Sequence, residues 1–315
     1  LGPIERQPER QPQIRNMALS THGKEFILAG PRHGIRVTGA EDISSFLFDL
    51  IPQWPLLRSQ DTPASENLCP IRIEKSADRW RISSPHLAPS RYDLRGGYTL
   101  ANALIGALIA AYVAQGENLV SIHAGAVRVG DGLVLLLGDN GSGKSTFATL
   151  LAAMGQRCFA DDRLILDLQG DVPNGLSLAI APKVRLPLPE EATAVYGEFV
   201  DQYSILVQPG MAVLRPGPDR AADFGERLPI KALVHLDRDN SADQATLTAM
   251  RQPPMVRILL EQLSAPHLNQ QGELAACVAL AGSVDSWQLR YHSAFSAADM
   301  LLSHFADGAG RDQEA

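Results

Sequence analysis

The stretch from residue 138 to residue 145 carries the residue types and spacing that point most clearly to chemistry. It reads G-x-x-x-x-G-K-S, as Gly138, Asp139, Asn140, Gly141, Ser142, Gly143, Lys144 and Ser145, with Thr146 next in line. Glycines in this pattern let backbone N–H groups surround phosphate oxygens, the lysine reaches the β- and γ-phosphates, and the serine hydroxyl binds Mg²⁺. The sequence therefore predicts a phosphate-binding loop (P-loop) for a nucleoside triphosphate.

The flanks of this loop match the structure that the motif needs. Residues 133–137 are apolar and predict a buried strand, and Phe147, Leu150, Leu151 and Met154 then follow at helical spacing. Gly155 is placed to end that helix. Strand, glycine loop and helix are the context in which this motif binds phosphate, so a chance match in a glycine-rich turn is the weaker interpretation.

Two adjacent carboxylates, Asp161 and Asp162, close the next predicted strand at 157–160. Beside a γ-phosphate they suit phosphoryl transfer to a hydroxyl, because one can share the Mg²⁺ shell while the other accepts the proton of the attacking group. Adjacent carboxylates repel, so one of the pair is expected to have a raised pKa and to be the better base near neutral pH. The alternative is a solvent-exposed turn that ends the strand.

His123 ends an apolar run shortly before the P-loop strand. If the two strands share a sheet, its imidazole would lie near the transferred phosphate and orient a carboxylate or stabilise charge. The alternative is a histidine with a structural role in the core.

His123-Ala124-Gly125, the P-loop and the run Phe159-Ala160-Asp161-Asp162-Arg163 together resemble the HPr kinase/phosphorylase family. The resemblance implies a P-loop kinase core and ATP with Mg²⁺ as cofactors. It further implies His123 and Asp162 as acid–base residues, and Asp161 with Ser145 at the metal. Ala124 departs from the family, which has glycine after this histidine.

The N-terminal part, with Asp78-Arg79-Trp80, looks more like the HPr-kinase-related peptide kinases of lasso-peptide biosynthesis. Those kinases phosphorylate a precursor peptide, commonly on its C-terminal serine. The expected activity is thus ATP-dependent phosphorylation of a serine in a peptide or small protein. Three alternatives stay open: an HPr-type protein serine kinase, a small-molecule kinase and a non-catalytic ATP-binding regulator.

Two basic residues, Lys183 and Arg185, are candidates for binding phosphate or a peptide carboxylate, Arg185 with the better geometry because its guanidinium is planar and bidentate. A surface basic pair is the competing interpretation. Residues 208–228 are rich in Pro, Gly and Arg and predict a mobile loop.

Composition limits the partners. The net charge of −7 argues against nucleic acid, and three widely spaced cysteines predict free thiols in a reducing cytoplasm. Residues 96–116 carry no charge and approach the length of a membrane span, but their Ala, Gly, Thr and Asn content favours a buried helix. Whether the chain forms a homo-oligomer is left open.

The expected fold class is α/β: a P-loop kinase core preceded by a smaller mixed α+β domain. The predicted divisions are a disordered tail at 1–16, an N-terminal domain at 17–118, a kinase domain at 119–306 and a flexible tail at 307–315. Within the N-terminal domain we expect a hairpin of strands at 25–29 and 34–38, a helix at 42–51, and strands at 71–74 and 80–82.

Overall fold

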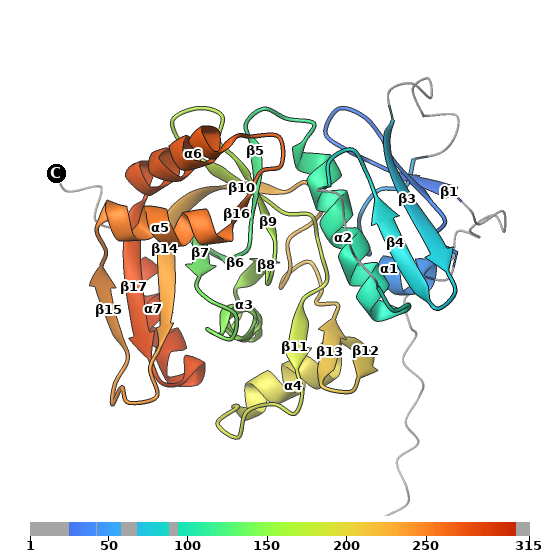
Figure 1. Ribbon diagram of the computed structural model, residues 1–315. Coiled ribbons are helices and arrows are strands. Elements are labelled where there is room, and N and C mark those ends of the chain that lie inside the picture. The colour runs from blue at the N-terminus through green and yellow to red at the C-terminus, as the bar shows by residue number, and fades with distance from the viewer. Residues whose placement is uncertain (1–24, 42, 58–67, 88–93, 307–315) are drawn as a thin grey trace, which may run out of the picture.

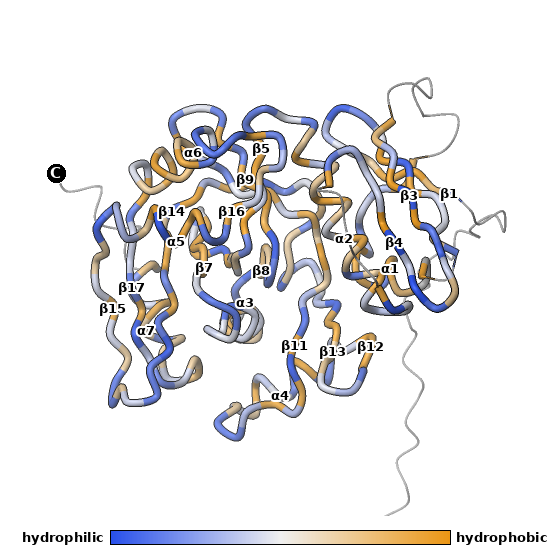
Figure 2. The backbone as a smooth tube through the Cα atoms, in the orientation of Figure 1, coloured by the Kyte–Doolittle hydropathy of each residue, from blue (hydrophilic) through white to orange (hydrophobic). Residues whose placement is uncertain are grey.

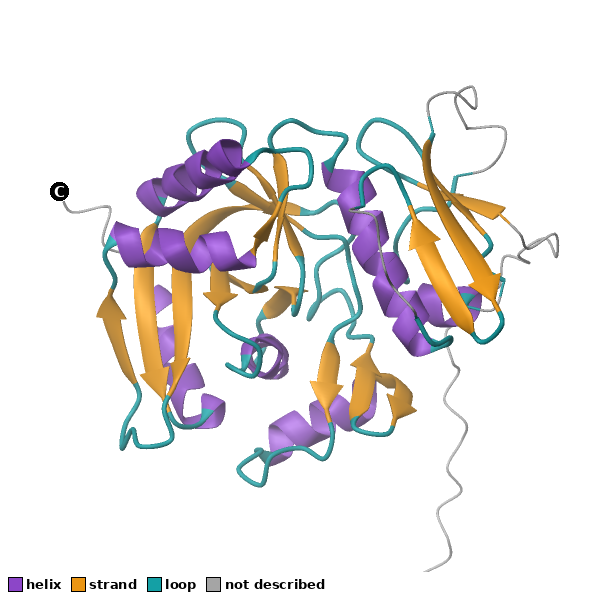
Figure 3. Cartoon of the chain, in the orientation of Figure 1, coloured by secondary structure: helices purple, strands orange, loops and turns teal. Residues whose placement is uncertain are grey.

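The computed structural model describes residues 25–41, 43–57, 68–87 and 94–306 (Figure 1). The tails predicted at 1–16 and 307–315 lie outside these ranges. Among the described residues the strands form three sheets, and helices pack against them (Figure 3). The architecture is mixed α/β.

The N-terminal part is a small sheet with two helices. Its strands and helices are β1 (Glu25–Leu28), β2 (Ile35–Thr38), α1 (Ser44–Leu50), β3 (Cys69–Ser76), β4 (Arg79–Ser83) and α2 (Tyr98–Val113). The strand order is β1-β2-β3-β4, in which β2 and β3 run parallel and the other neighbours antiparallel. The predicted hairpin, the helix near 42–51 and the two later strands are confirmed, with boundaries shifted by a few residues.

The uncharged helix α2 joins this part to the rest of the chain. Its buried residues, among them Leu104, Leu108 and Tyr112, lie around most of its circumference, as expected for a helix that is apolar on every side and enclosed by protein. The same core cluster includes Leu176 and Val213 from later in the chain. The predicted buried helix is confirmed, and no helix of the described residues has the length and apolarity needed to cross a membrane.

The central sheet of the described chain has ten strands. They are β5 (Leu119–Ile122), β6 (Gly125–Val129), β7 (Gly132–Leu137), β8 (Arg157–Ala160), β9 (Leu164–Asp167), β10 (Asn174–Leu176), β14 (Arg227–Arg238), β15 (Thr246–Ala249), β16 (Leu263–Ser264) and β17 (Asp285–Tyr291). The covering helices are α3 (Lys144–Ala153), α5 (Gln252–Gln262), α6 (Gln270–Ser283) and α7 (Ala294–Ala306).

Strand β14 organises this sheet. Its first residues pair with β10, and the remainder lies between β7 and β17, parallel to both. Strand β7 is buried along its whole length and strongly hydrophobic (Figure 2), as expected for a strand covered on both faces. Leu135 and Leu137 pack into the core beneath α5 and α6, whereas Val134 and Leu136 pack into the core beneath α3 and α7.

A third unit extends beside α3. It contains β11 (Lys183–Arg185), α4 (Ala194–Tyr203), β12 (Ser204–Gln208) and β13 (Met211–Leu214), with β13 between β11 and β12. The prediction of a loop at 208–228 is wrong for residues 211–214, which form β13, whereas residues 215–226 lie outside the helices and strands, as expected for a loop. Strand β13 pairs with two neighbours, and Ala221 forms a parallel bridge with Cys158 of β8. Composition alone missed the pairing of β11 with β13 and the bridge to β8, because both join distant parts of the sequence, whereas β12 and β13 form a local hairpin.

Candidate active site

Three segments meet at one edge of the central sheet. Strand β6 is antiparallel to both β7 and β8, so the start of β6 lies beside the carboxyl ends of β7 and β8. His123 precedes β6, the P-loop follows β7, and Asp161 with Asp162 follows β8. The fold thus brings together the three groups singled out from the sequence, at the edge where open α/β sheets bind ligands.

The P-loop is held open by backbone conformations that favour glycine. Gly138, Gly141 and Gly143 have φ values of 144°, 90° and 99°, a region that other residues rarely adopt. A Cβ on Gly138 would approach the Ser142 Oγ to 2.8 Å, whereas a Cβ on Gly141 would meet nothing within 4 Å. On the far side, the Tyr291 hydroxyl donates to the carbonyl oxygen of Ser142. The loop is therefore fastened to β17, and the space next to Gly141 is open.

Lys144 lies at the start of α3 and is 6% exposed. Its Nζ donates to the carbonyl oxygens of Gly138, at 2.6 Å, and Asp139, at 3.2 Å. Burial lowers the pKa of this ammonium group, and the charges of Asp162 and Asp139 oppose the shift. No carboxylate of the described residues lies within ion-pair distance of it, so the loop holds a buried positive charge that an anion would match.

The first turn of α3 connects the loop to the carboxylates. The Ser145 Oγ donates to the main-chain carbonyl oxygen of Asp161 over 3.2 Å. The Thr149 Oγ1 donates to the Ser145 carbonyl oxygen at 2.7 Å and lies 2.9 Å from the Tyr196 hydroxyl. The two residues expected at the metal, Ser145 and Asp161, are therefore neighbours.

The adjacent aspartates occupy opposite environments. Asp161 is 3% exposed, and its Oδ2 accepts the Lys183 backbone N–H at 2.9 Å. Burial, with a smaller contribution from the Asp162 charge, raises its pKa to about 6 although Lys183 opposes the shift. The Asp162 side chain is 40% exposed, and its Oδ1 lies 3.0 Å from the His123 Nε2. Desolvation would raise its pKa, but the hydrogen bond from His123 and nearby cations outweigh it and lower the pKa to about 2.

A cavity of about 500 Å³ contains these groups. Its lining includes His123, Asn140, Gly141, Gly143, Lys144, Ser145, Thr146, Asp161, Asp162, Lys183, Arg185, Tyr196, Met211 and Arg238. Lys183 reaches it from β11, but its Nζ donates to the Asn102 Oδ1 of α2 at 2.6 Å. Arg185 lines the same cavity, and its guanidinium forms no hydrogen bond or ion pair with another described residue. Of the two, Arg185 is the one left available to a ligand.

Sequence reasoning missed Arg238, Tyr291 and Tyr196. Arg238 closes β14 and pairs in register with Tyr291 of β17. A signal for both was available, because ligands bind at the carboxyl ends of parallel strands and these residues end two of them. Tyr196 lies on α4, and nothing local in the sequence links α4 to the P-loop.

The oxygen atoms of this site fit Mg²⁺ only together with the phosphate oxygens of a bound ligand. Among the described residues no three His, Cys, Asp or Glu side chains form a metal site by themselves. Ser145 and Asp161 instead offer hard oxygen atoms beside the P-loop, which is how Mg²⁺ is commonly held with one or two carboxylates and substrate phosphates.

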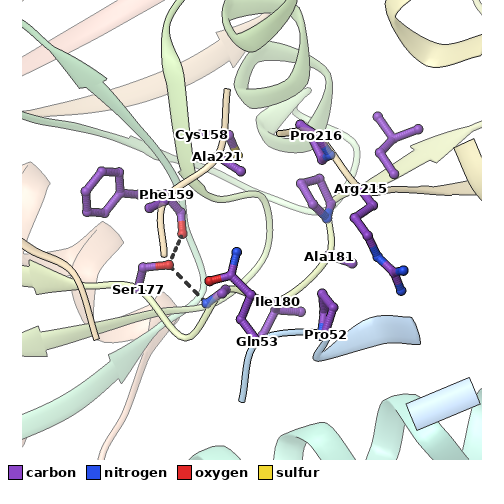
Figure 4. A pocket seen from close by; sticks show the side chains of 14 residues that line it. Pro52, Gln53, Cys158, Phe159, Ser177, Ile180, Ala181, Arg215, Pro216 and Ala221 are labelled. Carbon is purple, nitrogen blue, oxygen red and sulfur yellow. Dashed lines mark hydrogen bonds between the residues drawn. The ribbon is translucent and has the colours of Figure 1, made fainter. Parts of the chain in front are cut away.

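A separate small cavity, of about 30 Å³, is lined by Cys158 and Phe159 of β8 among other residues (Figure 4). Ser177 also lines it, and its Oγ donates a hydrogen bond to the Phe159 carbonyl oxygen and accepts one from the Ala179 N–H. Burial raises the pKa of the adjoining Cys158 thiol far above its ordinary value, which keeps the thiol protonated and unreactive. The candidate catalytic residues line the larger cavity and not this one.

No protein-family model and no curated protein matches this chain. Among solved structures, the chain is similar to the Hpr(Ser) kinase/phosphatase from Coxiella burnetii, with 11% sequence identity and a TM-score of 0.33. The matched region covers 60% of this chain and 99% of that one.

Proposed function

We propose that this protein is an ATP- and Mg²⁺-dependent kinase that phosphorylates a serine hydroxyl of a peptide or small protein. One observation carries the proposal: a P-loop with a buried lysine shares a single cavity with a carboxylate that is hydrogen-bonded to a histidine. The loop can bind the β- and γ-phosphates of a donor, and the exposed carboxylate can receive the proton of an acceptor.

The roles of the residues follow from burial and charge. Lys144 and the backbone N–H groups of the loop bind the phosphates. Asp162 is ionised, partly exposed and oriented by His123, so we assign it as the proton acceptor, although its lowered pKa makes it the weaker base of the pair; Asp161 is enclosed. The raised pKa expected for the base therefore falls on the other member of the pair. Ser145 and Asp161 would hold Mg²⁺, which neutralises phosphate charge when bound.

The transfer step balances with these groups. The acceptor Oγ forms a bond to the γ-phosphorus while the bond from that phosphorus to the β–γ bridging oxygen breaks, leaving ADP. The proton of the serine hydroxyl passes to the Asp162 carboxylate. Arg185, at the rim of the cavity, is placed to bind an acidic group of the acceptor, and the resemblance noted above favours a ribosomally made, lasso-type precursor peptide.

The test is incubation with Mg-ATP and a panel of serine peptides, small proteins and hydroxylated metabolites, read by mass spectrometry. A phosphate-sized gain on serine that requires Lys144 is the expected result. Gain on metabolites alone would reassign the acceptor to a small molecule. ATP binding without transfer to any acceptor would favour a regulator and overturn the kinase.

Asp162→Asn tests the base. Loss of general-base catalysis lowers kcat by about 10²–10⁴-fold, and the affinity for ATP should stay within about twofold of the wild-type value. Asp171→Asn is the matched control, because Asp171 is exposed in a turn at the far end of β9. Full activity of the Asp162 variant would refute the assignment.

A further inference from the structure

A second cavity, also of about 500 Å³, flanks the P-loop on its other side. Its lining includes Asp139 and Ser142 of the loop and His235, Asp237, Arg238 and Asn240 from the end of β14 and the turn after it. Strand β14 and strand β6 lie on opposite sides of β7 (Figure 1). The two cavities therefore flank the loop, the first toward β6 and β8 and the second toward β14.

The two cavities share Gly141 and Arg238. The Arg238 guanidinium forms no hydrogen bond or ion pair with another described residue, and a Cβ on Gly141 would meet no atom within 4 Å. The two cavities therefore adjoin at these residues, so one elongated ligand could occupy both, with Arg238 beside it.

The two cavities differ in the charge of their side chains, so each should favour a different end of such a ligand. The first cavity has more cationic than anionic side chains: Lys144, Lys183 and Arg185 against the carboxylates of Asp161 and Asp162. The second cavity has two carboxylates, Asp139 and Asp237, against Arg238 alone. A polyphosphate is attracted to the first cavity and repelled by the second, so the second suits an uncharged group rich in hydrogen-bond donors.

We infer that the second cavity binds the ribose and base of the nucleotide, an inference that rests on the proposed use of ATP. The Asp237 Oδ2 accepts the Gln288 Nε2–H at 2.7 Å, which fixes the carboxylate and leaves Oδ1 for another donor. A ribose hydroxyl is such a donor, and carboxylates at the end of a strand commonly bind it. Burial lowers the pKa of His235, which favours its neutral form. His235 and Asn240 therefore supply neutral polar groups for a base.

Calorimetry with Mg-ATP and with magnesium tripolyphosphate separates the two cavities. The wild-type protein should bind ATP at least about tenfold more tightly. Asp237→Asn, which keeps the side-chain shape, should weaken ATP binding by about tenfold, as expected for loss of a hydrogen bond to a charged group. Binding of tripolyphosphate should not weaken, because the variant removes a carboxylate that repels it. Either 2′-deoxy-ATP or 3′-deoxy-ATP should show the same loss in the wild type and no further loss in the variant.

Two further variants sharpen the result. Arg238→Gln should weaken both ligands, because the guanidinium lines both cavities; unchanged affinities would refute its place beside the ligand. Asp285→Asn is the matched control, since Asp285 is exposed at the amino end of β17, at the opposite edge of the sheet.

The inference and the proposed function fail in different ways. Equal affinity for ATP and tripolyphosphate, or an equal loss of both in Asp237→Asn, would overturn the nucleoside site even where serine phosphorylation is observed. A preference for ATP that depends on Asp237, together with no transfer to any acceptor, would uphold the site and overturn the kinase.

Discussion

Replacing Asp161 by asparagine should make the ligand-free protein more stable above about pH 6 and leave its stability unchanged near pH 4. The carboxyl ionises near pH 3.8 in an unfolded chain and at about pH 6 in the folded one. Between those values the folded state keeps a proton that the unfolded state has lost, so raising the pH destabilises the fold. The penalty is absent below about pH 4 and complete above about pH 6.

The magnitude follows from the difference of about two pKa units. Each unit corresponds to about 1.4 kcal/mol, so the ionised carboxylate costs the fold about 3 kcal/mol at neutral pH. Asparagine is uncharged, and its side-chain oxygen can still accept the Lys183 N–H that Asp161 Oδ2 accepts. The variant therefore removes the cost and keeps the contact.

Urea unfolding in the presence of a chelator, at several pH values between about 4 and 8, measures this difference. The free energies of unfolding of variant and wild type should coincide near pH 4 and diverge by about 3 kcal/mol at pH 8. Asp162→Asn is the built-in contrast: the pKa of Asp162 is lowered, so that variant should lose stability near neutral pH. A pH-independent difference, or an Asp161 variant less stable at pH 8, would refute the reasoning.

Three other predictions concern Lys144, Tyr291 and the ion pair between Glu226 and Arg157. Lys144→Met should abolish measurable binding of tripolyphosphate, which calorimetry checks. Because the variant removes a buried ammonium, it should also raise the thermal midpoint of the ligand-free protein, which thermal unfolding checks. Tyr291→Phe deletes the hydrogen bond to the Ser142 carbonyl and should weaken tripolyphosphate a few-fold, about 1 kcal/mol, with kcat for bound ATP unchanged. Glu226→Gln should lower the free energy of unfolding by about 1–2 kcal/mol, measured in urea, because the carboxylate accepts two hydrogen bonds from Arg157 at 2.6 and 2.9 Å with both side chains mostly buried.

The sequence predicted the local parts of the site because their determinants are local. The glycine pattern, the apolar run before it and the helical spacing after it lie within one short segment, and the structure has β7, the loop and α3 there. The buried helix α2 was predictable for the same reason. Because helix α2 carries no charged side chain, it is expected to be buried, whichever elements pack against it.

The partners of the loop could not be predicted in this way. Arg238 and Tyr291 reach it because β14 and β17 pair in parallel with β7 and with each other, and the register of such pairs depends on packing between segments far apart in sequence. The unequal burial of the two aspartates is similar. Strand β8 pairs with β6 through a shift of register between Ala126 and Val127, and a shift of one residue exchanges which side chain faces inward.

Lys144 and Asp161 carry opposite charges, are both nearly fully buried, and line the same cavity. Yet they form no ion pair with each other: the ammonium is held by loop carbonyls and the carboxylate by a backbone N–H. Burial opposes the charged form of each, and a direct pair would have relieved both. Keeping them apart leaves a site for a ligand that itself carries both signs. A phosphate group with its Mg²⁺ has that character, since the anion can pair with the lysine while the cation pairs with the aspartate. The cost that each charge imposes on the fold is thus what the proposed binding of metal and phosphate at this site would require.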